Sequence, residues 1–145
     1  MSLFSSLAVS ASGMAAQRAR TEVLVENLAN SETTRTPEGG PYRRKDVVFS
    51  EDSTLGSFSS ELHSVLGPAL SGVTVSETTI DDSAPELRYQ PGHPDANKDG
   101  YVAYPKINPA EDMVDLMGAS RGYEANVAAI SAVKDMINKS LDLFR

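Results

Sequence analysis

The sequence predicts an α+β fold in which long N- and C-terminal helices pair as an antiparallel coiled coil, with a small central β-hairpin-rich unit. Apolar residues recur with helical spacing at both ends of the 145-residue chain. Between the ends, prolines, glycines and short alternating runs replace that pattern. Two helices with apolar stripes that flank a polar, turn-rich segment are typical of a protein that assembles rather than one that catalyses a reaction.

The first expected unit is an N-terminal helix within residues 1–30. Its apolar stripe turns polar only around residues 18–22. No Lys or Arg precedes Arg18, and serines interrupt the apolar run, so the general secretory leader pattern is not met. We therefore expect a retained helix. The residues expected to form its packing seam are Leu7, Met14, Leu24 and Leu28.

The last expected unit is a helix within residues 108–145, which packs with residues 1–30. Asn108 is a good N-cap, Pro109 suits the first helical position, and Glu111 can reach back to the cap. An apolar or aromatic residue then recurs every seven positions, which is the pattern of a coiled-coil seam. The seam residues are Leu116, Tyr123, Ile130, Ile137 and Phe144, with Met113, Val127 and Leu141 in an adjacent row.

Two glycines interrupt the expected C-terminal helix. Gly118 and Gly122 each cost about 1 kcal/mol relative to alanine when exposed. Either a neighbouring helix approaches closely at these positions, or a long helix simply tolerates them. The sequence leaves both interpretations open.

The central unit, residues 31–107, is expected to hold two hairpins. Strands are predicted at 42–49, 72–80, 87–90 and 101–104. The turn-rich residues 91–100 join the last two strands. Residues from about 50 to 71 are Ser-rich and weakly patterned, so we expect a flexible surface loop there.

Composition excludes several classes of partner. The formal net charge of −7 repels nucleic-acid phosphates and anionic lipid. The chain has no cysteine, which excludes disulfides and thiolate zinc sites. No apolar run reaches the length of about 18 residues needed to span a membrane. We expect no nucleic acid, no direct membrane insertion and no small-molecule substrate.

One segment resembles a metal-binding motif. Residues 95–100, from Asp95 to Gly100, match the opening of an EF-hand loop, D-x-N-x-D-G. The closing position holds Lys106 where the motif needs a bidentate Glu. Nearby prolines also prevent helices from forming on either side of the loop. We therefore expect an Asx-rich turn and no metal site.

The sequence offers no catalytic group in a recognisable arrangement. His63 and His93 lie in loop-like sequence, without a nucleophile at a motif spacing. Asp81 and Asp82 are expected to be a solvated charge pair, because adjacent strand residues point to opposite faces. The basic residues 43–45 could contact an acidic partner, but we favour a solvated strand edge for them. We expect no catalytic residue and no cofactor.

Short motifs at the two helix ends resemble those of a known family. Residues 27–30 close the first helix, and residues 119–127 fall on the second. Both are similar to signature segments of the flagellar rod and hook family of bacterial axial proteins. Residues 40–49, 89–96 and 100–102 resemble a short proximal-rod member of that family. The motif residues are Asn27, Leu28, Ala29, Asn30, Ser120, Arg121, Tyr123, Glu124, Ala125 and Asn126.

The resemblance implies a structural subunit of the proximal rod of the flagellar basal body. Such subunits are exported by the flagellar type III apparatus without leader cleavage, and their terminal helices polymerise into a rod that carries motor torque across the periplasm. The implied partners are copies of the chain and the other rod subunits. A coiled-coil adaptor or secretion chaperone is the alternative function, and an enzyme is the third.

Three expectations concern side-chain roles and the free chain. Asn27 and Asn30 are expected to bind last-turn carbonyls or the emerging loop through their amides, and Asn30 tolerates the left-handed cap conformation. Arg121 and Glu124 are expected either to pair within the helix or to bridge to neighbouring subunits. The terminal helices are expected to be partly disordered until assembly buries them.

Overall fold

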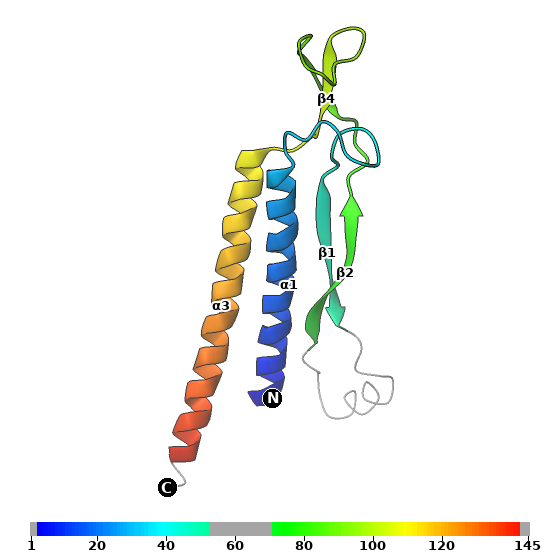
Figure 1. Ribbon diagram of the computed structural model, residues 1–145. Coiled ribbons are helices and arrows are strands. Elements are labelled where there is room, and N and C mark those ends of the chain that lie inside the picture. Colours follow the sequence, from blue (N-terminus) through cyan, green and yellow to red (C-terminus); the bar gives the residue numbers. More distant parts are fainter. Residues whose placement is uncertain (1–2, 53–70, 143–145) are drawn as a thin grey trace.

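Two long antiparallel helices organise the molecule. The computed structural model describes residues 3–52 and 71–142. Helix α1 spans Leu3–Ala29 and helix α3 spans Pro109–Asp142. They lie side by side and run in opposite directions, so both chain ends lie at the same end of the molecule (Figure 1). The predicted α+β class with paired terminal helices is confirmed.

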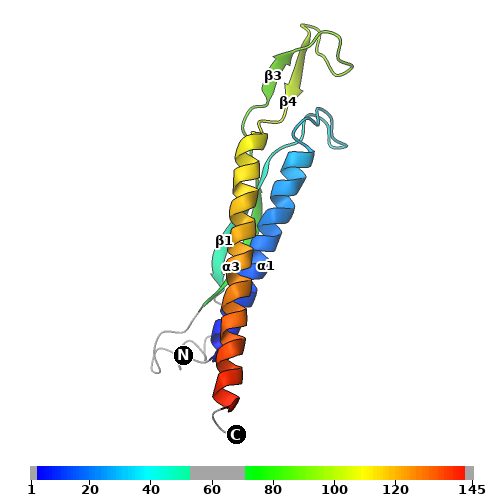
Figure 2. The same cartoon turned by 90° about the vertical axis from the view of Figure 1, so that its left-hand side faces the viewer.

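Helix α1 is the central layer of the fold. The antiparallel strands β1, Lys45–Asp52, and β2, Gly72–Ile80, pack on the side of α1 away from α3 (Figures 1 and 2). Among the described elements, α3 packs only against α1. The helix at the N-terminus is therefore covered on two sides, whereas the C-terminal helix is covered on one.

The first hairpin differs from the prediction at one strand. Strand β2 has the predicted bounds, but β1 begins at Lys45 and continues to Asp52, three residues later at each end than expected. The register shifts between Val48 and Phe49, which leaves Ser76 opposite no residue of β1. The Ser76 hydroxyl donates to the Val48 carbonyl at 3.0 Å. Most of the predicted Ser-rich loop lies outside the described residues.

A second hairpin projects beyond the helix pair as an arm (Figure 1). Strands β3, Glu86–Tyr89, and β4, Tyr101–Tyr104, pair antiparallel as predicted, with β3 starting and ending one residue earlier. Gly100 has a φ of 80°, which other residues rarely adopt, and it forms the tight return into β4. Tyr89 and Tyr101 stack edge to face across the pair at 5.3 Å.

The apolar core is small and is spread over several contacts. Its fully buried apolar residues are Ala16, Leu24, Tyr42, Val102, Tyr104, Ile107, Ala119 and Val133. The predicted cap of the C-terminal helix is confirmed, because the Asn108 Oδ1 accepts a hydrogen bond from the amide of Ala110 at 3.2 Å. Helix α3 begins at Pro109, as predicted. Phe144 and His63 lie outside the described residues.

Candidate assembly surface

Two amide side chains pack on glycines of the opposite helix where α1 and α3 meet. A Cβ placed on Gly13 would lie 2.9 Å from Oδ1 of Asn126, and one on Gly122 would lie 3.2 Å from Cδ of Gln17. The two contacts are reciprocal, because each helix supplies a glycine and, four residues along, an amide. Asn126 also donates to the Gly122 carbonyl at 2.8 Å. These glycines let the helix axes approach closely.

The two glycines of α3 therefore have different environments. Gly122 lies against α1, so the close-approach interpretation holds at this position. Gly118 is exposed, and a Cβ added there would meet no neighbouring atom of the described residues within 4 Å. Within the single chain, only one of the two glycines has a packing reason.

Asn27 connects the end of α1 to the start of β1. It is fully buried, its Nδ2 donates to the Lys45 carbonyl at 2.8 Å, and its Oδ1 accepts from the Lys45 amide at 3.0 Å. The same oxygen accepts a third hydrogen bond, from the Tyr42 hydroxyl at 3.0 Å. Burial and the negative charge of Glu26 raise the pKa of Tyr42 to about 12, so this hydroxyl remains a donor at neutral pH. One side chain thus fixes the chain reversal after the helix.

Asn30 caps the helix through its side-chain amide, as expected. Its Nδ2 donates to the Glu26 carbonyl at 2.9 Å, which satisfies a last-turn acceptor as predicted. Its Oδ1 accepts a hydrogen bond from the Thr33 hydroxyl at 3.1 Å. No described residue other than glycine has a positive φ, so Asn30 does not use the left-handed conformation that it could tolerate. The side chain, rather than a reversed backbone, ends the helix.

The prediction of a solvated edge for residues 43–45 was wrong for Arg44 and Lys45, whose side chains are 18% and 33% exposed, whereas the Arg43 side chain is 63% exposed. Each of them forms an ion pair within the chain: Arg43 with Asp82, Arg44 with Asp112 and Asp46, and Lys45 with Glu26. Carboxylates from α1, from α3, from β1 itself and from the segment after β2 supply these partners. The local sequence pattern of a strand gives no information about partners that lie in distant segments of the chain.

Asp112 and Arg44 form the most buried of these ion pairs. The Asp112 side chain is 1% exposed and that of Arg44 is 18% exposed, with Oδ1 and Nη1 3.0 Å apart. Burial raises the pKa of Asp112, Arg44 opposes that rise, and the carboxylates of Asp115, Asp46 and Glu111 add to it. Burial alone would lower the pKa of Arg44, but Asp112 and Asp46 reverse this effect and raise it.

The predicted seam residues differ in how far the single chain covers them. On α1, Leu24 is buried and Leu7, Met14 and Leu28 are half-buried. On α3, Leu116, Ile130 and Ile137 are half-buried, whereas Tyr123, Val127 and Leu141 are exposed. The row of α3 turned most closely to α1 is a neighbouring heptad row, Asp112, Ala119, Asn126 and Val133. The role of the predicted seam in assembly stays a prediction.

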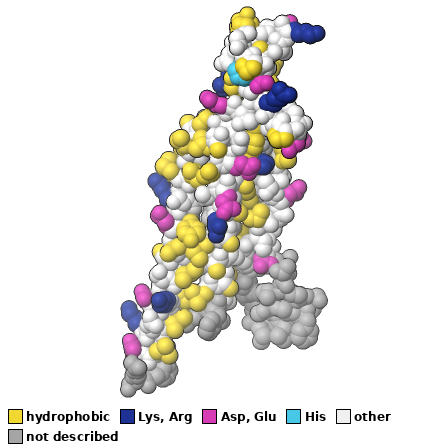
Figure 3. All heavy atoms as spheres, in the orientation of Figure 1, with side chains coloured by type: hydrophobic (Ala, Val, Ile, Leu, Met, Phe, Trp, Pro, Cys, Tyr) yellow, Lys and Arg dark blue, Asp and Glu magenta, His cyan; other side chains and the backbone are white. Residues whose placement is uncertain are grey.

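Helix α3 keeps a large apolar surface uncovered. Its exposed large hydrophobic residues are between 42% and 62% exposed and occur along its whole length. They are Met113, Val114, Met117, Tyr123, Val127, Met136 and Leu141. Figure 3 shows hydrophobic side chains gathered on the face formed by α3 and α1. A monomeric protein rarely exposes large apolar patches, and such patches mark interaction surfaces.

Helix α1 also leaves one stripe exposed, and it has coiled-coil spacing. The exposed positions recur at intervals of three and four residues. They are Ala8, Ala11, Ala15, Arg18, Glu22, Val25 and Ala29. Arg18 and Glu22 neutralise each other in an ion pair of 2.9 Å within the stripe. The stripe therefore consists mostly of alanine side chains and is close to neutral, which suits the approach of another helix.

The C-terminal motif residues lie mostly on the solvent side of α3. Ser120, Arg121, Tyr123, Glu124 and Ala125 are exposed, and only Asn126 is turned toward α1. No ion pair joins Arg121 to Glu124 or to any other residue in the described part of the chain. The N-terminal motif differs, because Asn27 is buried, Leu28 and Asn30 are half-buried, and Ala29 is exposed.

The segment resembling an EF-hand opening forms a turn within the arm. The Asn97 Oδ1 accepts hydrogen bonds from the amides of Asp99 at 3.0 Å and Tyr101 at 2.9 Å. Asp95 points elsewhere, since its Oδ2 accepts from the Thr34 hydroxyl at 2.8 Å. In residues 3–52 and 71–142, no group of three or more acidic, histidine or cysteine residues is placed to hold a metal ion. The Asx turn predicted here is confirmed.

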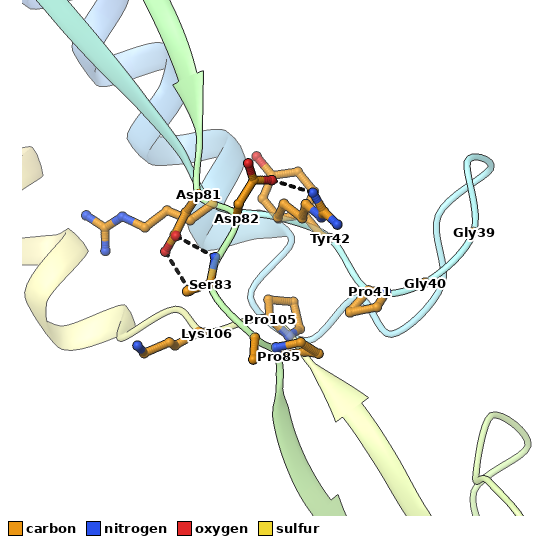
Figure 4. Close-up of a pocket in the computed structure, with 13 residues that line it drawn as sticks. Gly39, Gly40, Pro41, Tyr42, Asp81, Asp82, Ser83, Pro85, Pro105 and Lys106 are labelled. Atoms are coloured by element: carbon orange, nitrogen blue, oxygen red, sulfur yellow. Dashed lines mark hydrogen bonds and ion pairs between the residues drawn. The ribbon is translucent and has the colours of Figure 1, made fainter.

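A hollow of about 220 Å³ lies where the arm joins the body (Figure 4). Loop residues 39–44, the linker 81–85, and Pro105 and Lys106 line it. The Arg43 guanidinium and the Asp82 carboxylate are 2.6 Å apart, and Asp81 accepts hydrogen bonds from the amide and hydroxyl of Ser83. These charged groups are bound to one another or to the backbone rather than directed together into the hollow.

No helix in the described residues is long and apolar enough to cross a membrane. His93 is half-buried in the arm, and its Nδ1 accepts a hydrogen bond from the Asp95 amide at 3.1 Å. That bond places His93 as a turn residue, as the sequence indicated.

Sequence reasoning placed Asn27 at the helix end but missed its burial, and it missed Asp112 as a buried charge; both had a signal. Asn27 is a polar residue three positions after Leu24 on the apolar stripe, and Asp112 begins the heptad row that continues at Ala119. A polar residue in line with a buried stripe indicates a buried hydrogen bond or ion pair. The partners of both residues, in contrast, depend on the tertiary fold.

The motif segments on these two helices match known family models. Residues 7–35 match the model described as flagella basal body rod protein, and residues 98–143 match that of the flagellar basal body rod FlgEFG protein C-terminal. The first match ends just after the α1 cap, and the second includes all of the described part of α3.

Curated relatives extend the similarity over the whole chain. The flagellar basal-body rod protein FlgC of Bacillus subtilis is 49% identical over 99% of each chain. FlgC of Borreliella burgdorferi is 40% identical over 100% of this chain and 99% of its own, and FlgC of Salmonella typhimurium is 39% identical over 99% and 98%. Identity at this level over the full length reflects shared ancestry and fold. The chain therefore belongs to the FlgC family of flagellar basal-body rod proteins.

Proposed function

We propose that this chain is a structural subunit of the proximal rod of the bacterial flagellar basal body, which polymerises through its terminal helices and transmits motor torque across the periplasm. The observation that carries the proposal is the apolar surface that the single chain leaves uncovered on α3. Burying apolar area gains about 25 cal/mol per Å², so contacts with neighbouring subunits would stabilise this surface.

The two uncovered helix surfaces support contacts of the head-to-tail type. The exposed band on α3 and the exposed stripe on α1 are different surfaces, so a neighbour that covers one leaves the other free. Contacts between two different surfaces repeat from subunit to subunit and build open helical assemblies. The partners are copies of this chain and the other rod subunits. Its relatives are named flagellar basal-body rod proteins, which supports this choice of partners.

Export, location and the absence of catalysis belong to the same proposal. The chain reaches the rod through the flagellar type III export apparatus, without a cleaved signal peptide. It needs no cofactor and catalyses no reaction, because its role is to carry load. The paired charges around the hollow at the base of the arm support this view.

The experiment places a charge on the uncovered band of α3. Val127→Lys places a charge at an apolar residue that is 42% exposed and not in the buried row of α3, so the thermal melting of the free protein should change little. The amount of variant that copurifies with detergent-extracted basal bodies should fall, and the cells should swim poorly. Thr78→Lys, on the exposed strand β2, is the matched control and should assemble normally.

Two results would contradict the proposal. Normal rods built from the Val127→Lys chain would show that α3 does not provide the contact. A wild-type chain that stays in the cytosol with a cargo protein would favour the adaptor or chaperone function instead.

A further inference from the structure

The ion pair between Arg44 and Asp112 joins parts of the chain that are far apart in sequence. Asp112 lies in the first turn of α3, and Arg44 immediately precedes β1. Neither carboxylate oxygen of Asp112 accepts a hydrogen bond from the described residues, and the guanidinium at 3.0 Å is the cation paired with it. An uncompensated charge at so buried a position is expensive, because solvation is lost and nothing replaces it.

The other charged groups near Asp112 make its dependence on Arg44 stronger. Glu111 and Asp115 on α3 and Asp46 on β1 all carry like charge. The cation contributed by α1, Arg20, lies 3.9 Å from Asp115 instead. Arg44 is therefore the group that compensates the buried carboxylate.

The position of Arg44 depends in turn on the first hairpin. Its carbonyl accepts a hydrogen bond from the amide of Asp81 at 2.8 Å, directly beyond the Lys45–Ile80 pair that ends the β1–β2 ladder. The next residue, Lys45, is bound to α1, because its backbone amide and carbonyl both form hydrogen bonds with the Asn27 side chain. The Arg44 backbone is fixed at this place only when the two strands are paired and the hairpin is seated on α1.

We propose that the Arg44–Asp112 pair is a conformational latch, which allows the first turns of α3 to dock on α1 only after the β1–β2 hairpin has formed. Without the hairpin, docking would bury Asp112 without a cation. The start of α3 then stays undocked, and the apolar band of the helix is not presented in its final orientation. The latch is a property of the free chain and does not depend on rod assembly. For the first turns of α3 it therefore replaces the expectation that the terminal helices stay partly disordered until assembly.

The test combines three variants in a coupling cycle. Amide hydrogen exchange of residues 110–119 is measured in the dilute full-length chain for wild type, Arg44→Gln, Asp112→Asn and the double variant. Arg44→Gln should lower protection in this segment by at least about a hundredfold, since breaking a buried pair leaves one charge uncompensated. Asp112→Asn should retain protection, and the double variant should recover most of what Arg44→Gln loses.

Acidification supplies a second readout that a purely structural role of Arg44 would not give. Protonation of Asp112 removes the buried charge, so lower pH should restore protection in Arg44→Gln, measured relative to unfolded-chain exchange at the same pH. The double variant, which has no carboxyl group at position 112, should show no such recovery. If Arg44→Gln fails to fold at neutral pH, its refolding on acidification answers the same question.

Three outcomes would overturn the latch. Equal loss of protection in Arg44→Gln and the double variant would show that the charge of Asp112 is not what Arg44 compensates. Failure of acid to rescue Arg44→Gln would lead to the same conclusion. A wild-type chain with no protection in residues 110–119 would show that these turns do not dock in the free protein.

Discussion

Replacing Asn27 by alanine is the most direct test of how the fold supports its helix pair. The change removes one donor and one acceptor that together bind three groups: the amide and carbonyl of Lys45 and the hydroxyl of Tyr42. Asn27 is fully buried, and water replaces its hydrogen bonds poorly at this site. Each group left without a partner costs at least about 1 kcal/mol, so we expect a loss of about 3 kcal/mol in the free energy of unfolding.

A loss of this size is easy to measure. It is a large part of the roughly 5–15 kcal/mol that stabilises a typical domain. Urea unfolding followed by far-ultraviolet circular dichroism gives the midpoint and the slope, and a lower midpoint at unchanged slope indicates a change in stability alone. Tyr42→Phe removes only one of the three hydrogen bonds and should cost about 1 kcal/mol.

Asn30→Ala is the matched control at the end of the same helix. Asn30 is half-buried, and its bonds to the Glu26 carbonyl and the Thr33 hydroxyl are close to solvent. Its loss should cost about 1 kcal/mol or less. If the two asparagine variants were equally stable, the conclusion that Asn27 carries the junction between α1 and β1 would be refuted.

Three further predictions concern α3. Gly118→Ala should stabilise the free chain by up to about 1 kcal/mol. Gly122→Ala should stabilise it less or destabilise it, because the new Cβ would lie 3.2 Å from Cδ of Gln17. Equal shifts of the two urea midpoints would contradict this. Arg121→Glu should weaken copurification with basal bodies more than it lowers the melting temperature, and equal losses would argue against an interface role. Because the folded pKa of Asp112 is raised above its ordinary value of 3.8, stability should increase as pH falls through the folded pKa, and Asp112→Asn should lack this increase in melting curves taken over a pH series.

The helices could be predicted from sequence because their signals are local. A seven-residue repeat, an Asn-Pro start and the matching of charged residues to helix ends place α3 to within a few residues. The strands were less certain, since β1 is shifted by three residues relative to the apolar run that suggested it. The start of β1 is set by Asn27, which holds the Lys45 backbone, and this contact is not local.

The side-chain contacts between distant segments of the chain could not be predicted for the same reason. Arg44 looked like a surface residue in an exposed triplet, yet its partner, Asp112, lies in the distant helix α3. The contact of Gln17 with Gly122 likewise needs the register between two helices, and a repeating pattern of apolar residues allows several registers. Periodicity identifies which face packs, whereas the fold decides which residue meets which.

The division of apolar surface between folding and assembly follows from the order of the layers. Helix α1 uses two faces for contacts within the chain, while α3 fully buries only Asp112, Ala119 and Val133 among its described residues and leaves seven large hydrophobic residues exposed. The net charge of −7 opposes the approach of a second copy, so association depends on burying that apolar band. Salt screens the repulsion without weakening the apolar contact. Assembly of this chain should therefore strengthen as ionic strength rises, opposite to the behaviour of an interface held by ion pairs.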